Sequence, residues 1–185
     1  LPVQSGDNEI LQRMNRKYTR EHYLKLIKKI RDSFRKYKTG ALFAITTDII
    51  VGFPGETRAQ FLKTADIMKK IKYDVVYFGQ FSPRPETSAW KMKDNVSRKE
   101  KERREKYLNE ILKKTALENN NKYIGRIVDV LVEKEKNGFY IGKTRTMKDV
   151  KFALKKKNLV GKIVKVKIIK ANVWNLEACL PGKIK

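Results

Sequence analysis

Residues 46–57 read TTDIIVGFPGET and combine an apolar run with a tight turn. The apolar residues from 42 to 51 predict a strand that is buried on both faces. Glycine and proline at positions 52–55 predict a turn directly after it, because glycine permits backbone angles that other residues avoid. Thr57 can cap a helix whose apolar residues recur at helical spacing up to Lys72. Such a strand, turn and helix can bind a ligand, although on spacing alone a turn that only connects the elements is the commoner case.

Charge is the outstanding feature of the composition. The 185 residues include 44 Lys and Arg against 20 Asp and Glu, which leaves a formal net charge of +24. This excess predicts a polyanionic partner, and nucleic acid is the first candidate. Lysine supplies most of it, so lysine-rich solvated faces are the alternative explanation.

Cysteine and hydropathy exclude several classes of protein. Cys179 is the single cysteine, so the chain alone can build neither a disulfide framework nor a cysteine metal site. No stretch resembles a signal peptide or a membrane span. We therefore expect a cytoplasmic protein that does not contact a membrane.

The beginning of the chain resembles the end of a strand. Residues 1–3 are followed at once by Gln4 and Ser5, which we expect at the carboxyl edge of that strand, and then by a short helix over 7–14. Because the start of the strand is missing, we expect the chain to be a fragment. Arg16 lies in the next loop, where its planar guanidinium can hold a carboxylate or a phosphate.

Two more helices and one more strand are predicted before residue 122. Thr19 is expected to cap a helix that ends before a basic loop over 35–40. Residues 74–81 predict a second strand, with Gln80 at its end. The loop after it, SPRP, displays Arg84 between two prolines. A long charged helix over 96–121, capped by Ser97, then closes the domain at the asparagine run 119–121.

After Tyr123 the period changes from helical to alternating. Five short strands are expected, separated at 136–138, at Gly142 and at Gly161. Five strands in so short a stretch predict a small barrel like an OB-fold, although an SH3-like barrel has similar spacing. We therefore predict an α/β domain over 1–121 and an all-β barrel over 122–185.

Four sequence strings resemble those of the radical-SAM methylthiotransferases, in the order of that family. They are LPVQSG, MNRKYTREHY, DIIVGFPGET and FSPRPETSAWKM, which begin at residues 1, 14, 48 and 81. Within the family the likeness is greatest to the enzymes that place a methylthio group on N6-isopentenyladenosine beside the tRNA anticodon. The resemblance implies that the first domain is the C-terminal half of a radical-SAM (β/α) barrel of the TIM-like kind. At Glu86 family members usually have glycine, so this loop departs from the pattern.

The strings GKTRTMKDVKF and VKIIKANVWNLEACL resemble the TRAM domain, an RNA-binding barrel that ends these enzymes. The resemblance makes Lys143, Arg145 and Lys148 candidates for phosphate contacts. Trp174 is either a platform on which a base stacks or a filler of the core.

The resemblance also implies cofactors and their contacts. The intact enzymes use S-adenosylmethionine and two [4Fe-4S] clusters, whose ligands are cysteines. Arg84 is a candidate for contact with RNA, or with the carboxylate of the cofactor. The candidates for contact with S-adenosylmethionine are polar or glycine residues near the predicted strand ends: Gln4, Ser5, Arg16, Asp48, Gly52 and Gln80.

The chain lacks the cysteines that would bind the clusters, and this decides what it can do alone. We expect the cluster-binding N-terminal half to be a separate part of the enzyme, and we expect this chain, a monomer, to be inactive without it. No acid–base pair, nucleophile or metal site suggests another reaction. Two alternatives remain: an enzyme that acts on threonylcarbamoyladenosine in tRNA or on a ribosomal protein, and a non-catalytic RNA-binding module. In each tRNA case the partner is an anticodon stem-loop.

Overall fold

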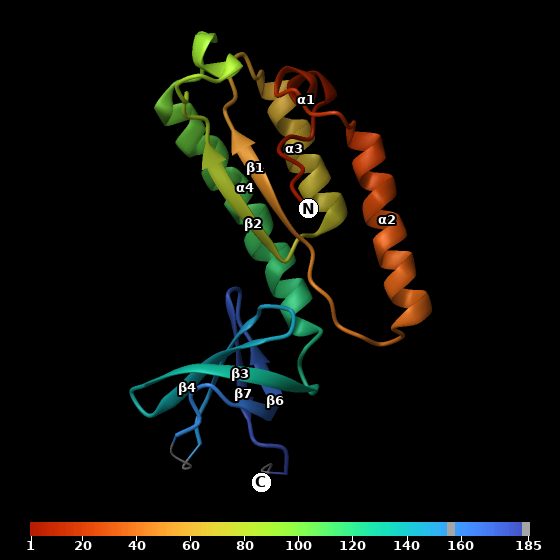
Figure 1. Ribbon diagram of the computed structural model, residues 1–185, viewed down its shortest axis with the longest axis vertical. Coiled ribbons are helices and arrows are strands. Elements are labelled where there is room, and N and C mark those ends of the chain that lie inside the picture. The colour runs from red at the N-terminus through yellow and green to blue at the C-terminus, as the bar shows by residue number, and fades with distance from the viewer. Residues whose placement is uncertain (155–157, 183–185) are drawn as a thin grey trace. The chain divides into compact units, whose positions relative to one another are not determined.

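The computed structural model describes residues 1–154 and 158–182, and it forms two compact units (Figure 1). One unit, here called the α/β unit, consists of Leu1–Ala41 and Ile45–Thr115. The other, here called the barrel unit, consists of Leu42–Ala44 and Ala116–Lys185. The predicted combination of an α/β part and an all-β barrel is confirmed.

A parallel sheet organises the α/β unit. β1 (Thr46–Val51) pairs with β2 (Val75–Gln80), so that Thr46 lies opposite Val75 and Val51 opposite Gln80. On the other edge of β1, Gln4 forms a parallel bridge with Ile49. Figure 1 shows both arrowheads pointing to the end of this unit where α1 and the loop between β2 and α4 lie. The chain before Gln4 thus runs along β1, as expected for the end of a strand.

The three longest helices begin directly after the caps that the sequence predicts, which are Thr19, Thr57 and Ser97. The helices and their bounds are Asn8–Arg13 (α1), Arg20–Tyr37 (α2), Arg58–Ile71 (α3), Ser88–Lys91 (η1, a 3-10 turn) and Arg98–Asn121 (α4). Thr19 accepts a hydrogen bond from the His22 N–H, and Thr57 forms a capping box with Gln60. The predicted loop over 35–40 is wrong in part, because α2 continues to Tyr37.

Burial along β1 corrects the prediction for that strand. Thr47, Ile49 and Val51 are buried, whereas Thr46 and Asp48 are exposed. The strand also starts at Thr46 rather than at residue 42. The described part of the chain therefore covers one face of the sheet and leaves the other face open, where the sequence predicted two buried faces.

The barrel unit is a closed five-stranded barrel in the order β3-β4-β5-β7-β6, and β3 also pairs with β6. Its strands are Ile127–Lys136 (β3), Phe139–Thr144 (β4), Asp149–Phe152 (β5), Ile163–Ala171 (β6) and Asn175–Cys179 (β7). All neighbouring strands are antiparallel except β5 and β7, which are parallel. Five strands in one small barrel match the OB-like architecture expected from the sequence.

Glycines have two different roles in the barrel. Asn137 and Gly138 have positive φ in the β3–β4 turn, as tight hairpins require. Gly142 was expected between two strands, but it lies inside β4 opposite Val132. A Cβ atom at this position would lie 2.1 Å from the carbonyl oxygen of Leu131, so glycine permits β3 and β4 to approach closely.

Candidate functional site

The turn after β1 is packed against the protein's own side chains. Gly52 has a φ of 69°, and a Cβ atom there would lie 2.5 Å from Cγ of Lys101. Lys101 Nζ donates hydrogen bonds to the Phe81 carbonyl at 3.0 Å and to Asp94 Oδ2 at 2.6 Å. Gly52 is itself buried. Glycine at this position is therefore explained by packing, whether or not a ligand also approaches the turn.

A buried ion pair lies below the same turn. Arg104 Nη1 donates to Glu56 Oε2 at 2.7 Å, and the two side chains are 6% and 2% exposed. The Gly52 N–H also donates to Glu56 Oε2, at 3.2 Å. Burial raises the pKa of Glu56, and the bond from Arg104 opposes that rise. Glu56 and Arg104 thus join the turn to α4.

Sequence reasoning missed this pair, although a signal was present. Lys101 and Arg104 continue the buried stripe of Leu108 and Ile111 at three- and four-residue spacing along α4. Charged side chains in the apolar stripe of a helix indicate buried partners, because an unpaired buried charge is costly.

Three polar residues lie along the sheet and at its end. Asp48 is exposed and lies opposite Tyr77 in the register, and its carbonyl accepts a hydrogen bond from the Gln4 N–H at 2.9 Å. Gln4 has a φ of 62°, which is unusual for a residue other than glycine. At the end of β2, Gln80 is exposed and its Nε2 donates to Glu105 at 2.8 Å. The structure therefore brings Gln4 and Asp48 together, with Gln80 at the strand end.

Ser5 has a different environment. It is fully buried, and its hydroxyl accepts a hydrogen bond from the Asp7 N–H at 3.2 Å. Its Oγ also lies 3.5 Å from Oγ1 of Thr64. These contacts fix the entry to α1, and they account for Ser5 without any ligand.

Arg16 and Arg84 are both exposed loop residues, as predicted. Arg16 lies between α1 and α2, and Arg84 lies between β2 and η1. Near Arg84, Glu86 has a φ of 65°. The loop therefore keeps a backbone conformation that suits glycine at the position where the family pattern has glycine.

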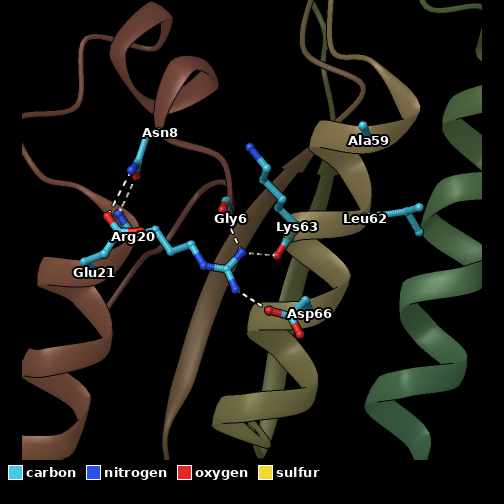
Figure 2. A pocket seen from close by; sticks show the side chains of 8 residues that line it. All are labelled: Gly6, Asn8, Arg20, Glu21, Ala59, Leu62, Lys63 and Asp66. Carbon is cyan, nitrogen blue, oxygen red and sulfur yellow. Dashed lines mark hydrogen bonds and ion pairs between the residues drawn. The ribbon is translucent and has the colours of Figure 1, made fainter.

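A cavity of about 480 Å³ lies among α1, α2 and α3, but the chain uses its polar groups internally (Figure 2). Arg20 Nη1 donates to the carbonyls of Gly6 at 3.1 Å and Lys63 at 2.9 Å, and Nη2 donates to Asp66. The guanidinium thus ties the start of α2 to α3. We assign this cavity a structural role.

Strand register gathers the predicted RNA contacts at one end of the barrel. Lys143 on β4 lies opposite Asp149 on β5, and Asp149 lies opposite Asn175 on β7. Trp174 directly precedes Asn175, while Arg145 follows β4. Residues that are distant in sequence therefore converge at the β4–β5 turn and the β6–β7 loop.

The exposure of these residues differs. Trp174 is 51% exposed, which excludes the core-filler alternative and leaves it available as a platform. Arg145 is exposed, and its Nε lies 3.8 Å from Asp129 Oδ2. Lys143 is partly exposed and pairs with Asp149 at 2.7 Å. Lys148 is only 7% exposed, so it does not belong to the exposed basic surface on which the sequence placed it.

A groove of about 290 Å³ adjoins this end of the barrel. Lys143 and Arg145 line it together with three apolar side chains, those of Leu131, Met147 and Ile163. All three of these apolar side chains are exposed. At the groove, a hydrogen bond from Lys165 and its charge hold the pKa of Asp129 below its usual range. The carboxylate therefore stays ionised beside Lys165 and Arg145.

Comparison with protein families agrees with the two units. The model of the Radical SAM superfamily matches residues 1–68, and that of the TRAM domain matches residues 121–180. None of the helices in the described ranges has the length and apolar character that a membrane span requires.

Curated relatives cover almost the whole chain. The tRNA-2-methylthio-N(6)-dimethylallyladenosine synthase of Bacillus cereus (strain AH187) is 46% identical over 179 residues, which is 95% of this chain and 34% of that protein. The proteins of the same name from Bacillus thuringiensis (strain Al Hakam) and Bacillus mycoides (strain KBAB4) are 45% and 44% identical over the same lengths. The chain spans about a third of the length of these relatives. The chain is therefore similar to about a third of these synthases, and it combines a segment that the Radical SAM model matches with a TRAM domain.

Proposed function

We propose that this chain is part of an enzyme that adds a methylthio group to N6-isopentenyladenosine beside the anticodon of tRNA. The observation that carries the proposal is the 46% identity, over 95% of the chain, to a synthase named for that product. The convergence of Lys143, Arg145 and Trp174 on one end of the barrel supports it, since phosphate contacts and base stacking are the usual means of RNA recognition.

We further propose that the α/β unit is the C-terminal half of a (β/α) barrel. Three parallel segments with helices between them support this, as does the open face of β1. In that arrangement the domain boundary lies at 121/122, with the TRAM domain over 122–185. The rest of the enzyme would complete the barrel, and the assembled enzyme acts as a monomer in the cytoplasm.

S-adenosylmethionine fits the open end of the sheet better than an iron–sulfur cluster does. Asp48 and Gln80 offer an exposed carboxylate and an exposed amide there, Gln4 is a partly exposed amide, and Arg16 and Arg84 offer guanidinium groups for a carboxylate. When bound, the cofactor supplies the radical that activates a C–H bond. Clusters need cysteine ligands, and the only cysteine, Cys179, lies in β7 of the barrel, so cluster binding belongs to other parts of the enzyme.

The proposal is tested with the complete enzyme in a bacterial strain whose tRNA lacks methylthio groups. Mass spectrometry of tRNA nucleosides is expected to show the methylthio derivative of N6-isopentenyladenosine. If only threonylcarbamoyladenosine gains the group, the substrate assignment is wrong. If no nucleoside changes although the enzyme is soluble and holds its clusters, the non-catalytic RNA-binding alternative replaces the proposal.

A further inference from the structure

We propose that Asn120 is a positioning residue for Trp174, so that the end of α4 sets the geometry of the RNA-facing loop. This inference rests on the proposed binding of RNA at this end of the barrel. Asn120 is one residue from the end of α4, and it belongs to the barrel unit together with Trp174.

Both side-chain hydrogen bonds that the described structure gives Asn120 reach the loop that carries Trp174. Its Nδ2 donates to the carbonyl of Asn172 at 2.8 Å and to the carbonyl of Val173 at 3.0 Å. These two residues directly precede Trp174, so both amide hydrogens hold the backbone that presents the indole. Asn120 is 2% exposed, and therefore water does not compete for these bonds.

The loop itself is a closed turn. The Asn172 N–H donates to the carbonyl of Asn175 at 2.8 Å, and Asn172 Nδ2 donates to Asn175 Oδ1 at 2.8 Å and to Glu177 Oε1 at 2.9 Å. These bonds close the turn on itself, while the bonds from Asn120 attach it to the helix. Without Asn120, the turn would keep its shape but lose its attachment.

The amide oxygen of Asn120 shows that this side chain does not serve stability alone. Asn120 Oδ1 is buried and has no hydrogen-bond partner among the described residues. A buried acceptor without a partner costs stability. The side chain is thus explained by its two donors, which an aspartate at this position could not supply.

The same segment also holds the second loop of the site. Tyr123 is buried, and its hydroxyl lies 2.6 Å from Oγ1 of Thr146 in the β4–β5 turn, next to Arg145. Thr146 Oγ1 is in turn 2.9 Å from Thr144 Oγ1. Residues 120–123 thus anchor the two loops that carry Arg145 and Trp174.

The test is a double-mutant cycle with Asn120→Ala and Trp174→Ala, measured as the Kd of this chain for an anticodon stem-loop. Trp174→Ala is expected to weaken binding about tenfold, the loss of one stacked base. Asn120→Ala is expected to weaken it about fivefold when Trp174 is present and less than twofold when Trp174 is absent. Asn121→Ala is the matched control, because Asn121 is an exposed neighbour on the same helix end.

A spectroscopic measurement separates positioning from a general loss of structure. The chain has two tryptophans, so Trp90→Phe leaves Trp174 as the single tryptophan, which is excited selectively above the absorption of tyrosine. Asn120→Ala should then speed the decay of its fluorescence anisotropy while the circular dichroism of the barrel stays unchanged. Should Asn120→Ala fail to fold, Asn120→Ser, which keeps one donor, takes its place and should show a smaller change in the same direction.

The outcomes distinguish the two proposals. If Trp174→Ala leaves the Kd unchanged, the proposed RNA surface is wrong and this inference falls with it. If Trp174→Ala weakens binding but Asn120→Ala weakens it equally in both backgrounds, the RNA surface stands and the positioning role is overturned. An unchanged anisotropy decay would overturn that role too.

Discussion

Glu56 Oε2 lies 2.7 Å from Arg104 Nη1, and this buried ion pair connects the turn after β1 with α4. Arg104 Nη1 also donates to the Glu56 carbonyl at 3.1 Å, and its Nε donates to Glu100 at 2.8 Å. One guanidinium therefore satisfies acceptors in the turn and within its own helix. The glycine turn at residues 52–55, which carries part of the resemblance to the family, lies against this ion pair through the bond from the Gly52 N–H to Glu56.

Arg104→Leu is expected to lower the free energy of unfolding by about 3–5 kcal/mol, because it leaves the Glu56 carboxylate buried without its charged partner. Urea denaturation of the chain measures the change. Lys113→Leu is the control, since the Lys113–Glu110 pair is exposed and should contribute less than about 1 kcal/mol. Equal losses in the two variants would show that the burial of the pair does not matter.

Gly142→Ala is expected to destabilise the barrel by about 2 kcal/mol or more, because the added Cβ overlaps the Leu131 carbonyl and forces β3 and β4 apart. Gly79→Ala is the matched control in β2, since a Cβ atom there meets nothing within 4 Å. Thermal unfolding followed by circular dichroism compares them. A Gly142→Ala variant as stable as Gly79→Ala would contradict the close approach of the two strands.

Glu100 predicts a dependence of stability on pH. Hydrogen bonds from Arg103, and next from Arg104, lower the pKa of Glu100 from 4.5 to about 2. A carboxyl whose pKa is lower in the folded state stabilises the fold above its unfolded pKa, and this contribution disappears as the pH falls from about 4.5 to about 2. Glu100→Gln should thus cost about 1 kcal/mol at pH 6 and almost nothing at pH 2. A difference that stays constant over this range, measured by urea denaturation, would refute the assignment.

Replacing Lys143 and Arg145 together with alanine should weaken binding to stem-loops of every sequence about equally. The slope of log K against log salt should also become shallower by about one to two, because phosphate contacts release counterions without reading bases. Lys134→Ala with Lys136→Ala removes two charges from the other end of the β3–β4 hairpin and should change the slope less. Equal effects of the two pairs would show that only net charge matters.

Arg16→Lys and Arg84→Lys should each lower the activity of the complete enzyme about tenfold or more, since lysine keeps the charge but loses the planar fork that grips a carboxylate or phosphate. Stem-loop affinity should stay within about threefold, because the barrel contacts persist. Arg58→Lys on the exposed start of α3 is the control. Full activity in both variants, measured as modified adenosine per enzyme, would remove the two arginines from the site.

Local sequence patterns predicted the helices and strands well, because caps and side-chain alternation depend on residues that are close in the sequence. Thr19 and Thr57 cap helices through bonds to residues three positions ahead, and alternation in the barrel follows from side chains within one strand. Short sequence strings also sufficed to find the resemblance to the methylthiotransferases. Tertiary structure alone decided what depends on distant partners: Arg104 is buried because Glu56 meets it, and Gly142 is required because the Leu131 carbonyl lies against it. In the same way the fold exposes Trp174 and buries Lys148, since exposure depends on which segments pack around a side chain and not on its neighbours in sequence.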